Sequence, residues 1–198
     1  MNQKSFDKLV IEHIWPILKE HGFQRDGENA DIFFRKANED VYHFVGLHRL
    51  RSGDRYYAMA YFSSPVIIED FHKRFPESIP MANANRHYIS PEDGVEDYQK
   101  MYFCRYEDSF LTSFERDFKP ALLKHGLPYL DNIQSVEDMI PFLRSDRFRG
   151  PALLYAGRKD EARTCIERQI EKISNIPLDE DGRVASALAF QKGLLGIR

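Results

Sequence analysis

The chain has 198 residues, a formal net charge of −3, 42% hydrophobic residues and 13% aromatic residues. This composition is typical of a globular protein with a large aromatic core, and it excludes an intrinsically disordered chain. The weak negative charge, without any strongly basic stretch, also argues against a general nucleic-acid-binding protein.

An amphipathic helix is predicted close to the N-terminus. Ser5 is a candidate N-cap, and Pro16 removes a backbone donor inside the helix, which predicts a kink or a break. Gly22 is expected to end the helix in the left-handed conformation. The apolar residues that recur at helical spacing are Phe6, Val10, Ile14, Ile17 and Leu18.

One phrase appears twice in the sequence. WPILKEHGF at residues 15–23 and KPALLKHGL at residues 119–127 share proline, leucine, histidine and glycine at the same places. We interpret both copies as helix ends, which predicts a second stop at Gly126. The alternative is a duplicated site with two matched histidines, His21 and His125.

A three-stranded antiparallel β-meander is predicted between the two copies. Its strands are residues 31–36, 41–50 and 55–64, which are rich in β-branched and aromatic residues and are joined at turn residues. Residues 23–25 are expected to add a short edge strand.

The register of the meander determines which side chains share a face, if both turns have loops of two or four residues. One predicted face is mainly apolar and comprises Ile32, Phe34, Val41, His43, Val45, Leu47, Ala58, Ala60 and Phe62. The other is aromatic with polar tips and comprises Phe33, Arg35, Tyr42, Phe44, Gly46, His48, Arg55, Tyr57, Met59 and Tyr61. A three-residue loop would break this assignment.

A ladder of aromatic residues follows a proline-rich stretch. Residues 67–75 are expected to form one short helix, and residues 81–88 lie in a long loop. A helix is favoured from about Val95, although the alternation in KMYFCRY also permits a strand. The ladder residues, spaced four apart, are Tyr98, Tyr102, Tyr106, Phe110, Phe114 and Phe118.

The last third of the chain is predicted to be helical. Ser135 and Asp138 form a capping pattern before one helix, a helical hairpin turns at Gly157, and residues 185–195 form a last helix. We therefore predict an α+β fold, in which amphipathic helices pack on the antiparallel meander. Residues 1–130 form the α+β domain and residues 131–198 a helical C-terminal subdomain.

No motif for nucleotide binding, metal binding or nucleophilic catalysis is present, so no catalytic residue, metal site or cofactor is predicted. His43 and His48 lie five residues apart, which places them on opposite faces of a strand and prevents them from sharing a metal. His43 is interpreted as a buried core histidine.

The aromatic face is the candidate binding site. His48 is predicted to pair with Tyr57, and the missing side chain of Gly46 is expected to leave a dip between the rings. An imidazole, several phenols and a guanidinium suit an anion or a peptide. The competing interpretation is that C-terminal helices cover this face. The candidate residues are His48, Tyr57, Tyr61, Tyr42 and Arg35.

The first third of the chain resembles a bacterial family catalogued as domain of unknown function 4304, and the segment LPYLDNI does so more loosely. The shared pattern is an amphipathic helix with a proline, a Gly-Phe stop and an aromatic strand. This resemblance implies no established activity, substrate or catalytic residue. It rests on Phe6, Pro16, Leu18, Gly22, Phe23, Phe33 and Arg35.

The sequence thus predicts a non-catalytic module that binds a protein partner, in the manner of a bacterial immunity or accessory protein. Tyrosine is abundant, with 10 residues, and is well suited to interfaces. The N-terminal segment lacks the apolar run of a signal peptide, and no apolar run reaches membrane-span length, so a cytoplasmic location without a membrane or nucleic-acid partner is expected. The alternative is a small enzyme or ligand-binding protein that uses the face around His48.

Overall fold

The computed structural model describes residues 1–25, 27, 31–68, 85, 87–90, 101–177 and 182–197. It divides the chain into two compact units. The first comprises residues 1–62 and 86–134, and the second comprises residues 63–85 and 135–198. The division at 134/135 lies close to the predicted one at 130/131, but the grouping of residues 63–85 with the C-terminal section was not predicted.

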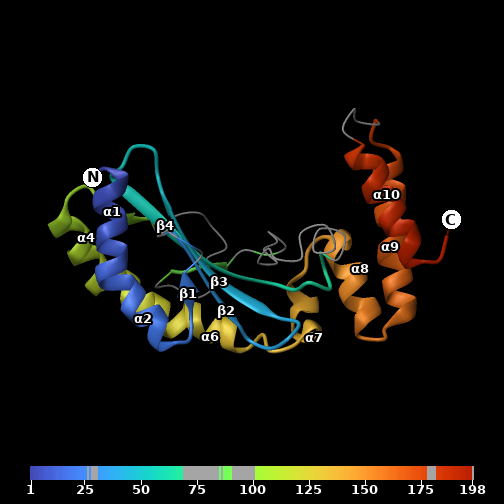
Figure 1. Ribbon diagram of the computed structural model, residues 1–198, viewed down its shortest axis with the longest axis horizontal. Coiled ribbons are helices and arrows are strands. Elements are labelled where there is room, and N and C mark those ends of the chain that lie inside the picture. The colour runs from blue at the N-terminus through green and yellow to red at the C-terminus, as the bar shows by residue number, and fades with distance from the viewer. Residues whose placement is uncertain are drawn as a thin grey trace. The chain divides into compact units, whose positions relative to one another are not determined.

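The first unit contains an antiparallel sheet, which confirms the predicted α+β fold (Figure 1). The strand order is β1-β2-β3-β4-β5, and β6 also pairs with β4, on the edge that β5 shares. The meander and the short edge strand are therefore confirmed. The strands are β1 Gln24–Arg25, β2 Ile32–Lys36, β3 Tyr42–Arg49, β4 Arg55–Ser63, β5 His87–Tyr88 and β6 Tyr102–Phe103.

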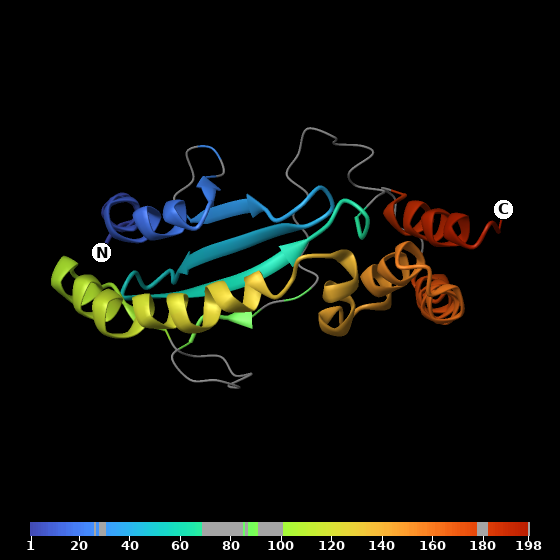
Figure 2. The ribbon, with the colours of Figure 1, turned by 90° about the horizontal axis from the view of Figure 1, so that it is seen from below.

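Two helical stretches pack against one face of this sheet (Figure 2). The first consists of α1 Gln3–Leu9, a π-helical turn Val10–Ile14 and α2 Trp15–Glu20. The second consists of α4 Glu107–Ser113, π-helical turn Phe114–Phe118, α5 Lys119–Ala121, π-helical turn Leu122–Gly126 and α6 Leu127–Asp131. The first stretch begins one turn earlier than predicted, because Asn2 rather than Ser5 is the N-cap: its side chain accepts from the Ser5 N–H at 2.8 Å.

Each π-helical turn ends two residues before a proline, namely Pro16, Pro120 or Pro128. A proline inside an α-helix donates no backbone hydrogen bond, and its ring collides with the carbonyl four residues earlier. A π-helical turn is wider and bonds residues five apart, as where the Trp15 N–H donates to the Val10 carbonyl. The helix thus passes each proline instead of ending there.

The aromatic ladder is divided between a strand and a helix. Tyr102 lies in β6 and Tyr106 caps the helix that starts at Glu107, so the favoured helix through Tyr102 is wrong and the strand alternative holds. The cause is long-range: β6 pairs with the beginning of β4, which no local pattern shows. The predicted start near Val95 and most of the predicted helix at 67–75 lie outside the described residues.

The two copies of the repeated phrase end differently. Gly22 has a φ of +80°, and the Phe23 N–H donates to the Leu18 carbonyl at 3.0 Å, so the predicted helix stop is confirmed there. Gly126 keeps right-handed helical geometry and the helix continues, so the predicted second stop is wrong. A Cβ at Gly126 would lie 3.1 Å from the Ile89 side chain, so this glycine serves close packing.

The loop between β2 and β3 has three residues, Asn38–Asp40, because the Ala37 N–H donates to the Val41 carbonyl at 2.9 Å. The Asn38 side chain stabilises this tight turn by accepting from the Asp40 N–H at 2.7 Å. The predicted register, which needed two or four residues, is therefore wrong for β2 by one residue, and a one-residue shift exchanges the two faces of a strand.

The exchange moves all of the β2 residues to the opposite face, including the predicted site residue Arg35. Phe33 and Arg35 pair with Val45 and His43 and lie on the face that the helices cover. The predicted pairing of β3 with β4 agrees with the structure, since the rings of His48 and Tyr57 stack across the two strands.

The second unit is helical in its described C-terminal part, as predicted. Ser135 and Asp138 form the predicted capping box, and Gly157 turns the helical hairpin with a φ of +74°. Its helices are α7 Val136–Met139, a 3₁₀ turn Ile140–Phe142, α8 Asp146–Tyr155, α9 Lys159–Ser174 and α10 Arg183–Leu194.

Two neighbouring tyrosines of the first unit differ in hydrogen bonding and provide a matched test of its core. Tyr56 and Tyr102 pair across β4 and β6 and are 0% and 2% exposed. The Tyr102 hydroxyl donates to the Ile89 carbonyl at 2.8 Å, whereas the buried Tyr56 hydroxyl has no hydrogen-bond partner within the described residues. Burial raises the pKa of both phenols, so both hydroxyls stay protonated.

Tyr56→Phe should raise the free energy of unfolding of the first unit by about 1 kcal/mol, and Tyr102→Phe should lower it by about 1 kcal/mol. The first change removes an unsatisfied buried group, and the second breaks a buried hydrogen bond. Urea unfolding followed by the fluorescence of Trp15, the single tryptophan, measures both. Equal effects of the two changes would contradict the assigned hydrogen bonding.

Candidate functional site

The face of the sheet that points away from the helices carries most of the predicted site residues. Its members follow from the strand pairings, since residues paired across antiparallel strands share a face. We call it the aromatic face, and its central members are Phe44, Gly46, His48, Arg55, Tyr57, Met59, Tyr61, Tyr88 and Phe103.

One half of the aromatic face is buried. The rings of Phe44 and Tyr61 stack with centroids 5.0 Å apart and planes at 5°, and their side chains are only 0% and 4% exposed. A Cβ on Gly46 would lie 3.1 Å from His48 Nε2 and 3.3 Å from the Tyr61 ring. The side chains of His48 and Tyr61 therefore fill the dip predicted over Gly46. Tyr61 is buried, which contradicts its predicted place in an open binding site.

The other half of the aromatic face reaches the surface. The His48 and Tyr57 rings stack at 5.0 Å, and Tyr88 adds a tilted contact with Tyr57 at 5.8 Å. All three side chains are half-buried, whereas Phe103 is 49% exposed. Tyr42, another predicted site residue, lies at the far end of β3, where the Lys36 ammonium is 5.9 Å from its ring.

Two arginines lie over aromatic rings at one corner of the exposed half. The Arg55 guanidinium lies 5.0 Å above the Phe103 ring, and that of Arg105 lies 5.3 Å from the Tyr106 ring. Tyr106 is the most exposed large hydrophobic residue at this corner, at 64%. The Cys104 N–H donates to the Asp54 carbonyl at 2.8 Å, which brings the end of β6 to the loop before β4.

Asp54 is the acidic residue in that loop. A hydrogen bond from the Ser52 hydroxyl holds the pKa of its carboxyl below the ordinary value, with smaller contributions from Arg55 and Arg105. The Asp54 carboxylate thus accepts a hydrogen bond from its neighbour Ser52. Within the described ranges, Arg51, Arg55 and Arg105 form no ion pair, and this corner presents cationic and aromatic groups together.

Arg35 lies on the opposite face, so the prediction that it shares the aromatic face with His48 is wrong. Its Nε donates to His43 Nδ1 at 3.1 Å, one terminal nitrogen donates to the His21 carbonyl at 3.0 Å, and the other forms an ion pair with Asp131. The guanidinium also lies 4.8 Å from the Phe23 ring. Arg35 therefore joins the sheet to the ends of α2 and α6.

His43 is the buried centre of this network, as the sequence predicted. It is 0% exposed, and Nδ1 accepts from Arg35 while Nε2 lies 2.6 Å from the Ile133 carbonyl. Since Nδ1 is an acceptor, the proton lies on Nε2 and the ring is neutral. Burial is the largest cause that lowers the pKa of His43 to about 4, and the Arg35 charge lowers it further.

The two cysteines, Cys104 and Cys165, are buried, and their thiols are unreactive at neutral pH. Burial raises the pKa of Cys104 to about 11, so its thiol is protonated at neutral pH and is a poor nucleophile. Desolvation likewise raises the pKa of Cys165. Among the described residues, no three histidine, cysteine, aspartate or glutamate side chains are grouped to hold a metal ion.

The sequence matches no family profile, no curated protein and no solved structure. The resemblance to domain of unknown function 4304 therefore stays a prediction. None of the helices in the described part of the chain is long and apolar enough to cross a membrane.

Sequence reasoning missed three members of the exposed half as parts of one surface. Phe103 lies in β6 and Tyr88 in β5, and both strands pair with residues of β4 that are distant in the sequence. Arg55 was placed on the correct face but not beside Phe103. The alternating pattern in KMYFCRY was the available signal, because a strand there would have put Phe103 on one face of the sheet.

Proposed function

We propose that the chain is a non-catalytic protein-binding module and that its partner binds the exposed half of the aromatic face. The observation that carries this proposal is the Phe103 ring, which is 49% exposed beside the His48–Tyr57 stack. The Arg55 guanidinium lies 5.0 Å from the same ring. Aromatic residues and arginine dominate the binding energy of protein interfaces, because they bury much area at a low entropic cost.

The charges at this corner favour an acidic partner segment. A guanidinium that stacks on a ring keeps its N–H donors in the ring-parallel plane, where they can bind a carboxylate with two hydrogen bonds. The guanidinium groups of Arg55 and Arg105 lie 5.0 Å and 5.3 Å from the centroids of the Phe103 and Tyr106 rings, and Arg51 is exposed nearby. The acidic Glu107 and Asp108 occupy the first turn of α4, where the positive end of the helix dipole offsets part of their charge.

The alternative function, a small enzyme or ligand-binding protein at the face around His48, has weaker support. A small-molecule site needs a concave pocket, and the space over Gly46 is filled by His48 and Tyr61. The remaining exposed aromatic surface suits a broad contact. We further propose a cytoplasmic location, since the two buried free cysteines suit a reducing compartment.

Site-specific photocrosslinking tests the proposal. With p-benzoylphenylalanine in place of Phe103, we expect one prominent adduct with a protein in the cells that naturally make the chain. Arg55→Glu in the same chain should abolish that adduct, because it reverses the charge offered to an acidic segment. The matched control carries the probe in place of Tyr155, which is 56% exposed in the second unit.

The same adduct from both probe positions, or none from position 103, would contradict the proposal. An adduct with nucleic acid would contradict it as well, since a basic and aromatic surface can also stack on bases.

A further inference from the structure

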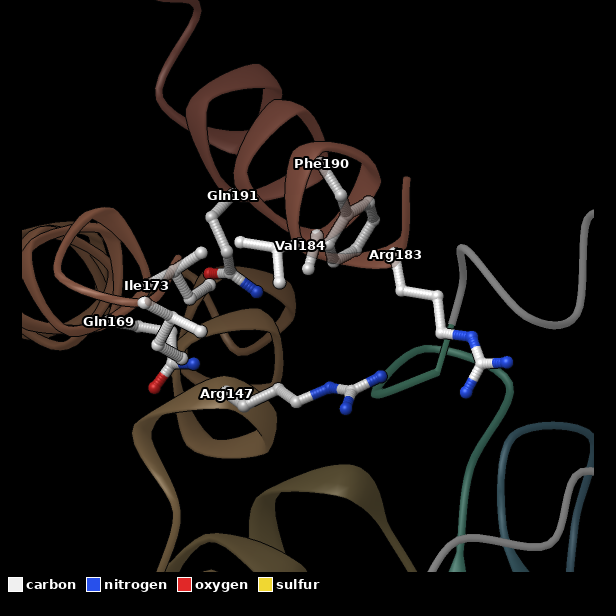
Figure 3. A pocket seen from close by; sticks show the side chains of 9 residues that line it. Arg147, Gln169, Ile173, Arg183, Val184, Phe190 and Gln191 are labelled. Carbon is white, nitrogen blue, oxygen red and sulfur yellow. The ribbon is translucent and has the colours of Figure 1, made fainter. Parts of the chain in front are cut away.

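A second site is suggested by a pocket in the C-terminal helices. It has a volume of about 240 Å³ and is lined by residues of α8, α9 and α10 (Figure 3). For comparison, an engineered apolar cavity of roughly 150 Å³ suffices to bind benzene. The pocket is therefore large enough for a small organic molecule.

The walls are apolar and one end holds a buried amide. Ile173 of α9 faces Val184 and Phe190 of α10 across the pocket. Gln191 also lines the pocket, and it is only 2% exposed. Its Oε1 is buried and has no hydrogen-bond partner within the described residues. In Figure 3 the Gln191 amide nitrogen points toward the pocket and its oxygen toward Ile173.

Positive charge occurs toward another side of the pocket. In Figure 3 the side chains of Arg147 and Arg183 extend toward the same side, away from Ile173 and Gln169. Arg183 begins α10, so the positive end of that helix dipole adds to the charge.

Arg147 is available to a ligand because its acidic neighbour is occupied. Asp146 accepts two hydrogen bonds from Arg168, both at 3.0 Å, and this ion pair joins α8 to α9. Arg147 itself forms no ion pair in the described part of the chain, and its guanidinium lies 5.5 Å from the Phe148 ring.

We propose that this pocket binds a small amphipathic anion, with its apolar body between α9 and α10 and its anionic group on Arg147. The polar and apolar groups are distributed as such a ligand requires: branched and aromatic side chains in the centre and guanidinium groups to one side. This site lies entirely within the second unit and does not depend on the aromatic face.

The fluorescent probe 8-anilinonaphthalene-1-sulfonate tests the proposal with the full chain, since it combines aromatic rings with an anionic group. We expect saturable binding, competition by octanoate, and much weaker competition by octan-1-ol, which lacks the charge. Arg147→Gln should weaken probe binding about tenfold, as loss of one charge-assisted contact predicts. Arg163→Gln, on the exposed surface of α9 where it pairs with Glu167, is the matched control and should leave binding unchanged.

A second variant tests the location of the apolar body. Ala187 lines the pocket, so Ala187→Phe should fill it and abolish competition between octanoate and the probe. Circular dichroism must show an unchanged helical spectrum for each variant, because the probe also binds loosened proteins. Unchanged affinity in Arg147→Gln, or octanoate competition that persists in a folded Ala187→Phe variant, would overturn the proposal.

Discussion

Lowering the pH from 7 to 5 should destabilise the first unit by about 2 kcal/mol through His43 alone, and the loss should reach about 3 kcal/mol at pH 4. In the folded protein the pKa of His43 is about 4, compared with 6.5 for an unperturbed histidine. Between pH 6.5 and pH 4, His43 is therefore mostly protonated in the unfolded chain and mostly neutral in the folded chain. This contribution to stability is complete above pH 6.5 and is lost as the pH falls from 6.5 toward 4.

The largest cause of the lowered pKa is burial of the ring, and the Arg35 charge lowers the pKa further, whereas the contact of Nε2 with the Ile133 carbonyl acts in the opposite direction. Protonation at Nδ1 would place a hydrogen against the N–H of Arg35, at a separation of 3.1 Å, and would add a second positive charge there. The negative charge of Asp131 raises the pKa of His43 and so offsets part of this lowering. Its influence is limited, because Asp131 pairs with Arg35 and its side chain is 53% exposed.

Urea unfolding at several pH values, followed by the fluorescence of Trp15, measures this effect. Trp15 is the only tryptophan and stacks on Phe33 in the first unit, with centroids 5.6 Å apart, so its signal reports on that unit alone. His43→Gln should be less stable at pH 7 and should lose the pH dependence between 7 and 5. His21→Gln, which changes an exposed ring, should retain it. An unchanged slope in His43→Gln would refute this assignment.

Phe118→Ala should lower the free energy of unfolding of the first unit by about 3–5 kcal/mol. Phe118 is 0% exposed and its ring contacts Tyr102 at 5.0 Å and Tyr56 at 5.9 Å, so its loss would leave a cavity between helix and sheet. The surrounding rings are held in the sheet and cannot collapse fully into that space.

The same fluorescence-detected unfolding experiment tests this prediction. Leu123→Ala is the control, because Leu123 follows on the same helical stretch but is 41% exposed. Its effect should stay within about 0.5 kcal/mol. Similar losses for both variants would show that the aromatic residues of this helix do not form the tight contact with the sheet described above.

The elements set by local sequence could be predicted, and the features set by distant contacts could not. The meander, the stop at Gly22 and the turn at Gly157 follow from strand patterns and glycine chemistry. Gly126 follows a histidine and precedes an apolar residue, as Gly22 does, but Pro128 and the side chain of Ile89 determine its geometry.

The candidate site shows the same limit. His48 and Tyr57 were correctly paired because the β3–β4 connection allowed the assumed register. Arg35 was misplaced because a loop of three residues, rather than two or four, reverses the faces of β2. Phe103 became part of the surface only through the pairing of β6 with β4, in which it lies opposite Arg55, a residue 48 positions earlier in the sequence.

The affinity of the crosslinked partner for purified variants tests the proposed binding face most directly. Isothermal titration calorimetry should show that Phe103→Ala weakens binding at least about tenfold, as expected for a central interface residue. Tyr155→Ala, which removes an aromatic ring of 56% exposure from the other unit, should bind as the unmodified chain does. Equal affinities for the unmodified chain and Phe103→Ala would contradict the assignment of the aromatic face as the binding site.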